Sequence, residues 1–315
     1  MESDPVPMPL DAPGNQSDAC PEPLSWREVL RRYRTESRTW EVERGPYTLR
    51  GRTWGDGPPL YFLSGIGGSH ELLALLIWLL RQQFRCVAWD YPGTQFSTEN
   101  LPGATAADLS ADLFALADAH GDERFHLYAT SFGAFVALEA MLAEQRRIEG
   151  AVLQGGFAHR KLAWFERVVS QACRHAPGCM RHLPGRDVIQ RQNHRRWFPP
   201  FDGSRWEFLV EDTGRIPLSS VANRAAMVHN RDLRPRLGEI RRRVLLLRSE
   251  GEPENFHVEL ESGLPNAQSQ LLHTSGHLPH LTHPHRTAKI VREFLLPEAA
   301  SDANTTLESV GNGST

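Results

Sequence analysis

The sequence predicts an α/β fold built around a mostly parallel, doubly wound sheet. Short apolar runs of four to six residues alternate along the chain with segments whose apolar residues recur at helical spacing. This alternation is typical of parallel strands that are covered by helices on both faces. The 315-residue chain is long enough for one large α/β domain or two small ones, and no internal repeat or linker divides its middle.

The alternation begins near residue 47. The turn 55–58, Gly-Asp-Gly-Pro, separates the first two expected strands. The segment 72–80 is almost entirely apolar, which indicates a buried helix, and 109–120 has apolar residues at helical spacing. In this half of the chain, strands are expected at 47–54, 60–63, 85–89 and 125–128, and helices at 72–80, 109–120 and 135–143.

The second half carries fewer strand signals. Strands are expected at 150–153 and 244–247, and the final helix at 287–296 repeats apolar residues at helical spacing. Between 157 and 230 the strand pattern disappears. Since ligands of such sheets bind beyond the carboxyl ends of the strands, residues that directly follow a strand are the first candidates for function.

Composition narrows the class of protein. Hydrophobic residues make up 40% of the chain and charged residues 23%, as in ordinary globular proteins. A net charge of -3 argues against a nucleic-acid-binding protein and gives no general attraction to membranes. The chain begins without a basic segment followed by an apolar one, and its longest apolar run is too short to span a bilayer, so we expect a cytoplasmic protein.

The two ends of the chain differ from its middle. Residues 1–22 are rich in Pro, Asp and Ser, and residues 298–315 are polar with Gly, Asn, Ser and Thr, so both are expected to be disordered tails. Four cysteines show neither disulfide nor zinc spacing, and reduced thiols are expected. They are Cys20, Cys86, Cys173 and Cys179.

A serine nucleophile is indicated by the segment 127–134, Leu-Tyr-Ala-Thr-Ser-Phe-Gly-Ala. An apolar strand stops at Ser131 and helix-forming residues follow, which exposes the hydroxyl on a sharp strand-to-helix turn. Such a turn needs small residues two positions before and after the serine, and here they are Ala129 and Gly133. The alternative is an ordinary helix N-terminus that Ser131 caps.

The loop before the last helix offers a base for Ser131. It has the sequence Thr-Ser-Gly-His-Leu-Pro-His-Leu-Thr-His-Pro over 274–284, and His277 follows its glycine. From that place His277 can lean back over the sheet and accept a proton. The alternative is a solvated polar loop, and four histidines at 277, 280, 283 and 285 leave metal binding open.

A base of this kind needs an orienting carboxylate, which is expected after the strand 244–247. Three glutamates follow that strand directly: Glu250, Glu252 and Glu254. We select Glu252 as the acid and interpret the other two as solvated loop charges.

With its order of serine, acid and histidine, the chain resembles the α/β-hydrolase superfamily, of the cap-bearing alpha/beta hydrolase 1 type, over roughly residues 45–296. Four further segments are similar to family motifs. They are Ser-Gly-Ile-Gly-Gly at 64–68, Asp-Tyr-Pro-Gly-Thr-Gln-Phe-Ser at 90–97, Asp-Leu-Arg-Pro-Arg-Leu at 232–237 and Ser-Glu-Gly-Glu-Pro at 249–253. Gly-His-Leu-Pro-His at 276–280 matches the family's Gly-His loop.

The resemblance implies roles for five residues. Ser131 would attack an acyl carbonyl, His277 would accept its proton, and Glu252 would orient His277. Backbone N–H groups of Phe132 and Ile66 would form the oxyanion hole. It further implies a small-molecule acyl substrate, an ester or thioester, cleaved through an acyl-enzyme with no metal or other cofactor.

Three residues depart from the family's commonest pattern. Ser64 replaces His, Ala129 replaces Gly, and Glu252 replaces Asp. The glycine-rich loop and the Tyr-Pro-Gly after Asp90 are also similar to the maspardin branch, regarded as adaptor-like, so an interaction protein without catalysis is the alternative. Serine at the nucleophile position disfavours the haloalkane dehalogenase and epoxide hydrolase branches, which use Asp there.

The resemblance also implies the domain organisation. A helical cap at 157–230 would interrupt a core formed by 23–156 and 231–297. The cap sequence contains twelve Lys/Arg against six Asp/Glu. A basic, aromatic lid could favour an apolar substrate with a carboxylate or phosphate, whereas in the simpler interpretation the aromatic residues pack on the core and the arginines face water.

Within the cap we single out the segment 194–197, His-Arg-Arg-Trp. The aromatic residues of the cap are Trp164, Phe165, Trp197, Phe198, Phe201, Trp206 and Phe208.

Overall fold

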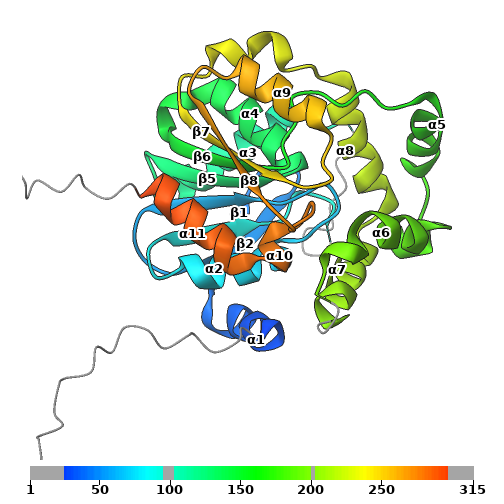
Figure 1. Ribbon diagram of the computed structural model, residues 1–315, viewed down its shortest axis with the longest axis horizontal. Coiled ribbons are helices and arrows are strands. Elements are labelled where there is room, and N and C mark those ends of the chain that lie inside the picture. Colours follow the sequence, from blue (N-terminus) through cyan, green and yellow to red (C-terminus); the bar gives the residue numbers. More distant parts are fainter. Residues whose placement is uncertain (1–24, 95–102, 200–202, 297–315) are drawn as a thin grey trace, which may run out of the picture.

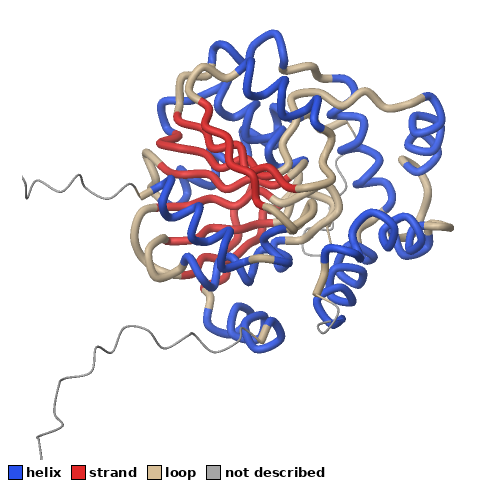
Figure 2. Tube along the Cα trace, in the orientation of Figure 1, coloured by secondary structure: helices blue, strands red, loops and turns tan. Residues whose placement is uncertain are grey.

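The computed structural model of the protein describes residues 25–94, 103–199 and 203–296 (Figure 1). At its centre lies an eight-stranded sheet in the order β1-β2-β4-β3-β5-β6-β7-β8 (Figure 2). β2 pairs antiparallel with β1 and β4, and all other neighbouring strands are parallel, which confirms the predicted fold class. The strands are β1 (Arg38–Glu43), β2 (Thr48–Trp54), β3 (Pro59–Leu63), β4 (Arg85–Trp89), β5 (Phe125–Thr130), β6 (Ile148–Gln154), β7 (Arg243–Ser249) and β8 (Ala267–Leu272).

Helices cover both faces of this sheet. In β3, Tyr61 and Leu63 pack in one apolar cluster with α3 and α4, while Leu60 and Phe62 pack in a second cluster with α2 and α11. Because both faces of the strand are buried, its sequence is continuously apolar. The core helices are α1 (Trp26–Glu36), α2 (Ala74–Leu80), α3 (Ala106–His120), α4 (Phe132–Glu144), α9 (Glu254–Gly263), α10 (Pro279–Thr282) and α11 (Pro284–Leu295).

Every strand and helix expected from the sequence is present, with bounds that differ by a few residues. The expected helix 72–80 begins instead as a 3-10 turn, His70–Leu73, and continues as α2. The pattern missed both outer strands, β1 and β8, as well as α1 and α9. Five of the six residues of β8 lack full burial because the strand lies at the edge of the sheet, so it has no apolar run to detect.

Between β6 and β7 the chain leaves the sheet and forms an insertion of helices, which we call the cap. Figure 1 shows these helices grouped to the right of the sheet. Apart from one isolated bridge between Cys179 and Pro217, the described residues of this insertion contain no strand. The cap helices are α5 (Trp164–Cys173), α6 (Arg186–His194), α7 (Gly203–Arg215) and α8 (Leu218–Asn230).

The aromatic residues of the cap differ in their exposure to solvent. Phe198 and Trp206 are buried against the core, as the packing interpretation predicted. Trp164 and Phe165 are exposed on α5. Phe201 lies outside the described residues, as do the expected tails 1–22 and 298–315. Over the part of the chain that the structure describes, no helix combines the length and the apolar character needed to cross a membrane.

Candidate active site

Ser131 lies between β5 and α4 on a backbone with φ 53° and ψ -114°. A positive φ is strained for any residue except glycine, and such strain clusters at functional sites. The Ser131 N–H donates to the carbonyl of Gln154 at 2.8 Å, and the Ala134 N–H donates to the Ser131 carbonyl at 3.0 Å. Within the described chain the Ser131 hydroxyl makes no bond to the start of α4, so the side chain does not act as a helix cap.

Of the two small residues around Ser131, Gly133 is the one that has to be glycine. A Cβ at position 133 would lie 2.3 Å from the carbonyl oxygen of Leu63. The methyl group of Ala129 is instead accommodated in the apolar cluster beneath α4. The departure from glycine at position 129 is therefore compatible with the turn.

Glu252 and His277 form a hydrogen-bonded pair beside this turn. His277 Nδ1 lies 2.9 Å from Glu252 Oε1, and the glutamate side chain is only 5% exposed. The other carboxylate oxygen, Oε2, accepts the backbone N–H of Ser249 at 3.0 Å and lies 3.1 Å from His257 Nε2. The extra methylene of glutamate is thus accommodated by the loop that follows β7.

The other two glutamates lie elsewhere. Glu250 Oε1 lies 3.1 Å from Nδ1 of the exposed His273, and Glu254 begins α9. Glu252 is therefore the glutamate of this loop that the structure brings to His277.

Its surroundings keep Glu252 ionised. Burial alone would raise its pKa, but hydrogen bonds from His257 and His277, the charge of His277 and the Ser249 N–H together lower the pKa to about 2. A carboxylate that stays charged can hold the Nδ1–H of a histidine and leave Nε2 free to accept a proton.

Two residues of this site were not found from the sequence. Gln154, at the end of β6, donates from Nε2 to the carbonyl of His277 at 2.9 Å and to Glu252 Oε1 at 3.3 Å. At Gly155, a Cβ would lie 2.5 Å from Glu252 Oε1 and 2.8 Å from His277 Cε1. Their position directly after a strand was the available signal, since functional side chains gather at that edge of the sheet.

The glycine-rich loop 64–69 faces Ser131 from the end of β3. The Gly68 N–H donates to the Gly65 carbonyl at 3.5 Å, which forms a turn with Ile66 at its corner. Among the described residues, the N–H groups of Ile66 and Phe132 are not donors in any hydrogen bond. Both groups are thus available to a ligand. Ser64 is buried at the start of the loop, where the family pattern has His.

Two buried charged residues of the cap hold this loop from outside. Arg224, on α8, donates to the Ile66 carbonyl at 2.7 Å and to the Pro92 carbonyl at 3.2 Å. Asp212, on α7, accepts the Ser69 N–H at 3.0 Å and the Ser69 hydroxyl at 2.5 Å. The cap therefore holds this turn at its corner, Ile66, and directly after its end, at Ser69.

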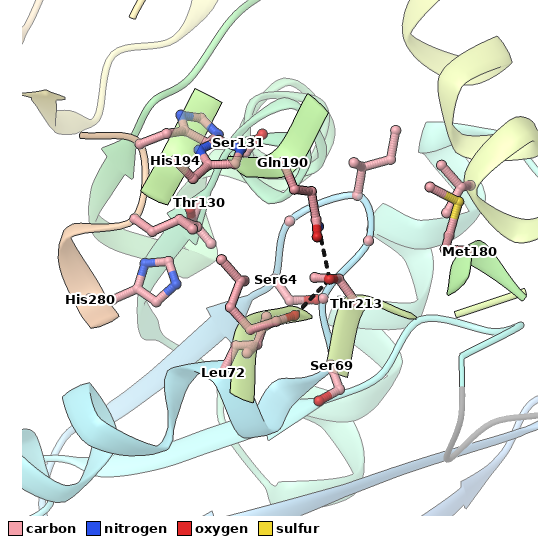
Figure 3. Close-up of a pocket in the computed structure, with 18 of the residues that line it drawn as sticks. Ser64, Ser69, Leu72, Thr130, Ser131, Met180, Gln190, His194, Thr213 and His280 are labelled. Carbon is pink, nitrogen blue, oxygen red and sulfur yellow. Dashed lines mark hydrogen bonds between the residues drawn. The ribbon is translucent and has the colours of Figure 1, made fainter. Parts of the chain in front are cut away.

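Two cavities meet at Ser131 and His277. The first, of about 210 Å³, runs beneath the cap and is also lined by the glycine-rich loop; Figure 3 shows Ser131 and His194 toward one of its ends and Met180 toward the other. The second, of about 170 Å³, is lined by Gly155, Glu252 and neighbouring residues. The expected hydrogen bond between Ser131 and His277 is not formed in the described structure, and such bonds are often long without substrate.

The cap segment 194–197 touches the histidine loop. The rings of His194 and His277 are stacked with centroids 6.1 Å apart. Burial, and then the charge of His277, lower the pKa of His194 to about 4, so this ring is neutral beside His277. Trp197 lies against Gly276, whose added Cβ would meet its ring at 2.3 Å. The segment thus packs on the loop that carries His277.

The remaining histidines of the loop do not form a metal centre in the described structure. Burial, and then the charge of His277, lower the pKa of His280 to about 3. Across residues 25–94, 103–199 and 203–296, no three His, Cys, Asp or Glu side chains are grouped to hold a metal ion.

The sequence of this chain is similar to those of known hydrolases. A family model described as alpha/beta hydrolase family matches residues 60–290. A putative carbamate hydrolase, RutD, of Agrobacterium fabrum (strain C58) is 26% identical over 269 residues, which are 80% of this chain and 98% of its own.

Solved structures show the same fold. A thermophilic esterase from Thermogutta terrifontis superposes with a TM-score of 0.70 and 20% identity, covering 82% of this chain and 98% of its own. The enol-lactonase from Burkholderia xenovorans LB400 superposes with a TM-score of 0.70 and 19% identity, covering 81% of this chain and 99% of its own. At such identities the likeness concerns the fold and not the substrate.

Proposed function

This chain belongs to the alpha/beta hydrolase family, and from that premise we propose that it is a serine hydrolase. It cleaves an ester or thioester of a small or medium acyl substrate through an acyl-enzyme, with Ser131 as nucleophile, His277 as base and Glu252 as the orienting acid. The observation that carries the proposal is the hydrogen bond between the buried Glu252 and the half-buried His277 beside a serine on a strained turn.

The first half of the reaction forms the acyl-enzyme. The Ser131 oxygen attacks the carbonyl carbon while His277 Nε2 takes the hydroxyl proton, and ionised Glu252 stabilises the resulting imidazolium. The carbonyl oxygen becomes negative and accepts hydrogen bonds from the N–H groups of Phe132 and Ile66. His277 then gives its proton to the leaving alcohol or thiol as the bond to carbon breaks.

In the second half, water replaces the leaving group. His277 removes a proton from water as its oxygen attacks the acyl carbon, and then returns that proton to the Ser131 oxygen as the ester bond breaks. The N–H groups of Phe132 and Ile66 serve both halves, because each passes through a tetrahedral oxyanion.

The size of the substrate follows from the volumes of the two cavities. Their volumes of about 210 and 170 Å³ suit one modest group on each side of the scissile bond. The relative from Agrobacterium fabrum is named as a carbamate hydrolase, so a carbamate is a second acyl class to include beside esters and thioesters.

A panel of p-nitrophenyl esters, acyl-thioesters and a p-nitrophenyl carbamate, with acyl chains of graded length, tests the proposal. The wild-type chain should hydrolyse short and medium members, and Ser131→Ala should lose this activity while remaining folded. If folded wild-type protein hydrolyses no member faster than Ser131→Ala does, the chain is an interaction protein of this fold and the proposal is wrong.

A further inference from the structure

Large apolar side chains are exposed mainly on one part of the cap. Of the eight that are exposed in the described residues, six lie on α5 and α6. They are Trp164, Phe165, Val168, Val169, Val188 and Ile189. In Figure 1, α5 lies at the outer edge of the cap, away from the sheet, whereas α6 contributes Gln190 and His194 to the cavity at Ser131. The four on α5 share one helix, and an exposed apolar face of this kind usually marks an interaction site.

The helix α5 has its polar side toward the protein. Ser170 is half-buried and its hydroxyl donates to the Ala222 carbonyl of α8 at 3.1 Å. Trp164, 77% exposed, and Val168, 62% exposed, lie on the opposite side at a spacing of four residues. An amphipathic helix normally packs the other way round. The outer apolar face of α5 is therefore free to be buried against something else.

The segment of the cap that contains α5 and α6 carries an excess of positive charge. Residues 158–198 contain nine Lys/Arg and two Asp/Glu, a formal charge of +7 in a chain whose net charge is -3. The exposed cations of this segment include Lys161, just before α5, and Arg167, on α5, and Arg181, Arg191 and Arg196 farther along. A helix with Trp and Phe on its outer side within a basic segment has the composition of one that lies in a lipid interface. Anionic headgroups attract such basic segments.

We propose that the outer face of α5 docks the protein on an anionic lipid surface. Trp164 and Phe165 enter the interface, and the exposed cations of the segment 158–198, Lys161 and Arg167 first, contact the headgroups. A second copy packed face to face would bring two regions of like charge together, which electrostatic repulsion opposes. The positive charge of this segment is outweighed by negative charge elsewhere in the chain, so the net charge of -3 indicated no attraction to membranes.

Co-sedimentation of the full chain with vesicles tests this proposal. Binding is expected to vesicles of phosphatidylcholine mixed with phosphatidylglycerol, and to be at least about tenfold weaker to pure phosphatidylcholine or in high salt. Val168→Glu should lower the partition coefficient about tenfold or more. Val258→Glu is the matched control, because Val258 is 55% exposed on α9, outside the cap, and should leave binding unchanged.

The outcome does not depend on catalysis, so Ser131→Ala should bind as the wild-type chain does. Absence of binding to the mixed vesicles, or equal loss in the Val168 and Val258 variants, would overturn the proposal. So would a concentration-dependent dimer in sedimentation velocity that Val168→Glu dissociates, since a second copy would then cover the face. Should Val168→Glu unfold, the neutral variant Val168→Gln takes its place.

Discussion

Two glutamate–histidine pairs join the same two loops of this protein, Glu252 with His277 and Glu250 with His273. The nitrogen-to-oxygen distances are alike, at 2.9 and 3.1 Å, and both involve Nδ1 of the histidine. Their surroundings differ, since the Glu252 side chain is 5% exposed and that of Glu250 is 38% exposed.

The difference lies in what else each carboxylate contacts. Glu252 also accepts hydrogen bonds from the Ser249 N–H and Gln154 Nε2, and its partner histidine lines the cavities next to Ser131. An exposed ion pair in water contributes little to stability and restrains its histidine little, whereas a buried carboxylate holds a histidine in one tautomer and direction. In the proposed mechanism, the burial of Glu252 and its neighbouring donors, rather than the pair itself, distinguish the acid and base from the surface pair.

The largest contrast is expected at the two histidines. His277→Ala should lower kcat/KM for the best ester of the panel by about 10⁴- to 10⁶-fold, because the base for both half-reactions is lost. His273→Ala should leave kcat/KM within about twofold, since a surface change far from the reacting atoms alters little. Steady-state kinetics on the two folded variants check this, and similar losses in both would remove the distinction between the pairs.

Replacing Glu252 should lower activity far more than replacing Glu250. Glu252→Gln keeps the shape of the side chain but loses its charge, so kcat should fall about 10³-fold. Glu250→Gln should behave like the wild-type chain. Equal effects in the two variants, measured with the same ester, would contradict the choice of Glu252.

Stability should depend on pH through Glu252. Its folded pKa of about 2 is below the ordinary 4.5, so the ionised carboxylate stabilises the native state fully above pH 4.5 and this stabilisation is lost as pH falls toward 2. The pH-dependent part amounts to about 3 kcal/mol. Denaturant unfolding at pH 7 and pH 3 should show a gap between wild type and Glu252→Gln that narrows at pH 3. A gap of constant size would contradict the low pKa.

A smaller effect is expected where the cap holds the glycine-rich loop. Arg224→Met removes the donor to the Ile66 carbonyl, so kcat should fall about thirtyfold through a misplaced oxyanion donor while KM changes within about twofold. Arg191→Met, on the exposed side of the cap, is the matched control. A higher KM with unchanged kcat would mean that Arg224 serves binding and does not position the loop.

Much of the fold could be predicted because buried parallel strands leave a local signature. Continuous apolar runs identified the inner strands, while the edge strands β1 and β8 lack such runs and were missed. Ser131, Glu252 and His277 were selected because each stands in a recognisable loop after a strand. Gln154 stands at a strand end, but that place does not reveal its partners, which lie more than 90 residues away in the sequence. Asp212 carries no local signature, since its role arises from contact with Ser69, also more than 90 residues away.

Labelling with a fluorophosphonate probe tests most stringently whether the Glu252–His277 pair activates Ser131 as a nucleophile. One label per folded chain is expected, mapped by mass spectrometry to the peptide that contains Ser131 and absent in Ser131→Ala. Labelling should be slowed strongly by Glu252→Gln and left unchanged by Glu250→Gln. A folded chain that takes no label, or one labelled at another residue, would contradict it.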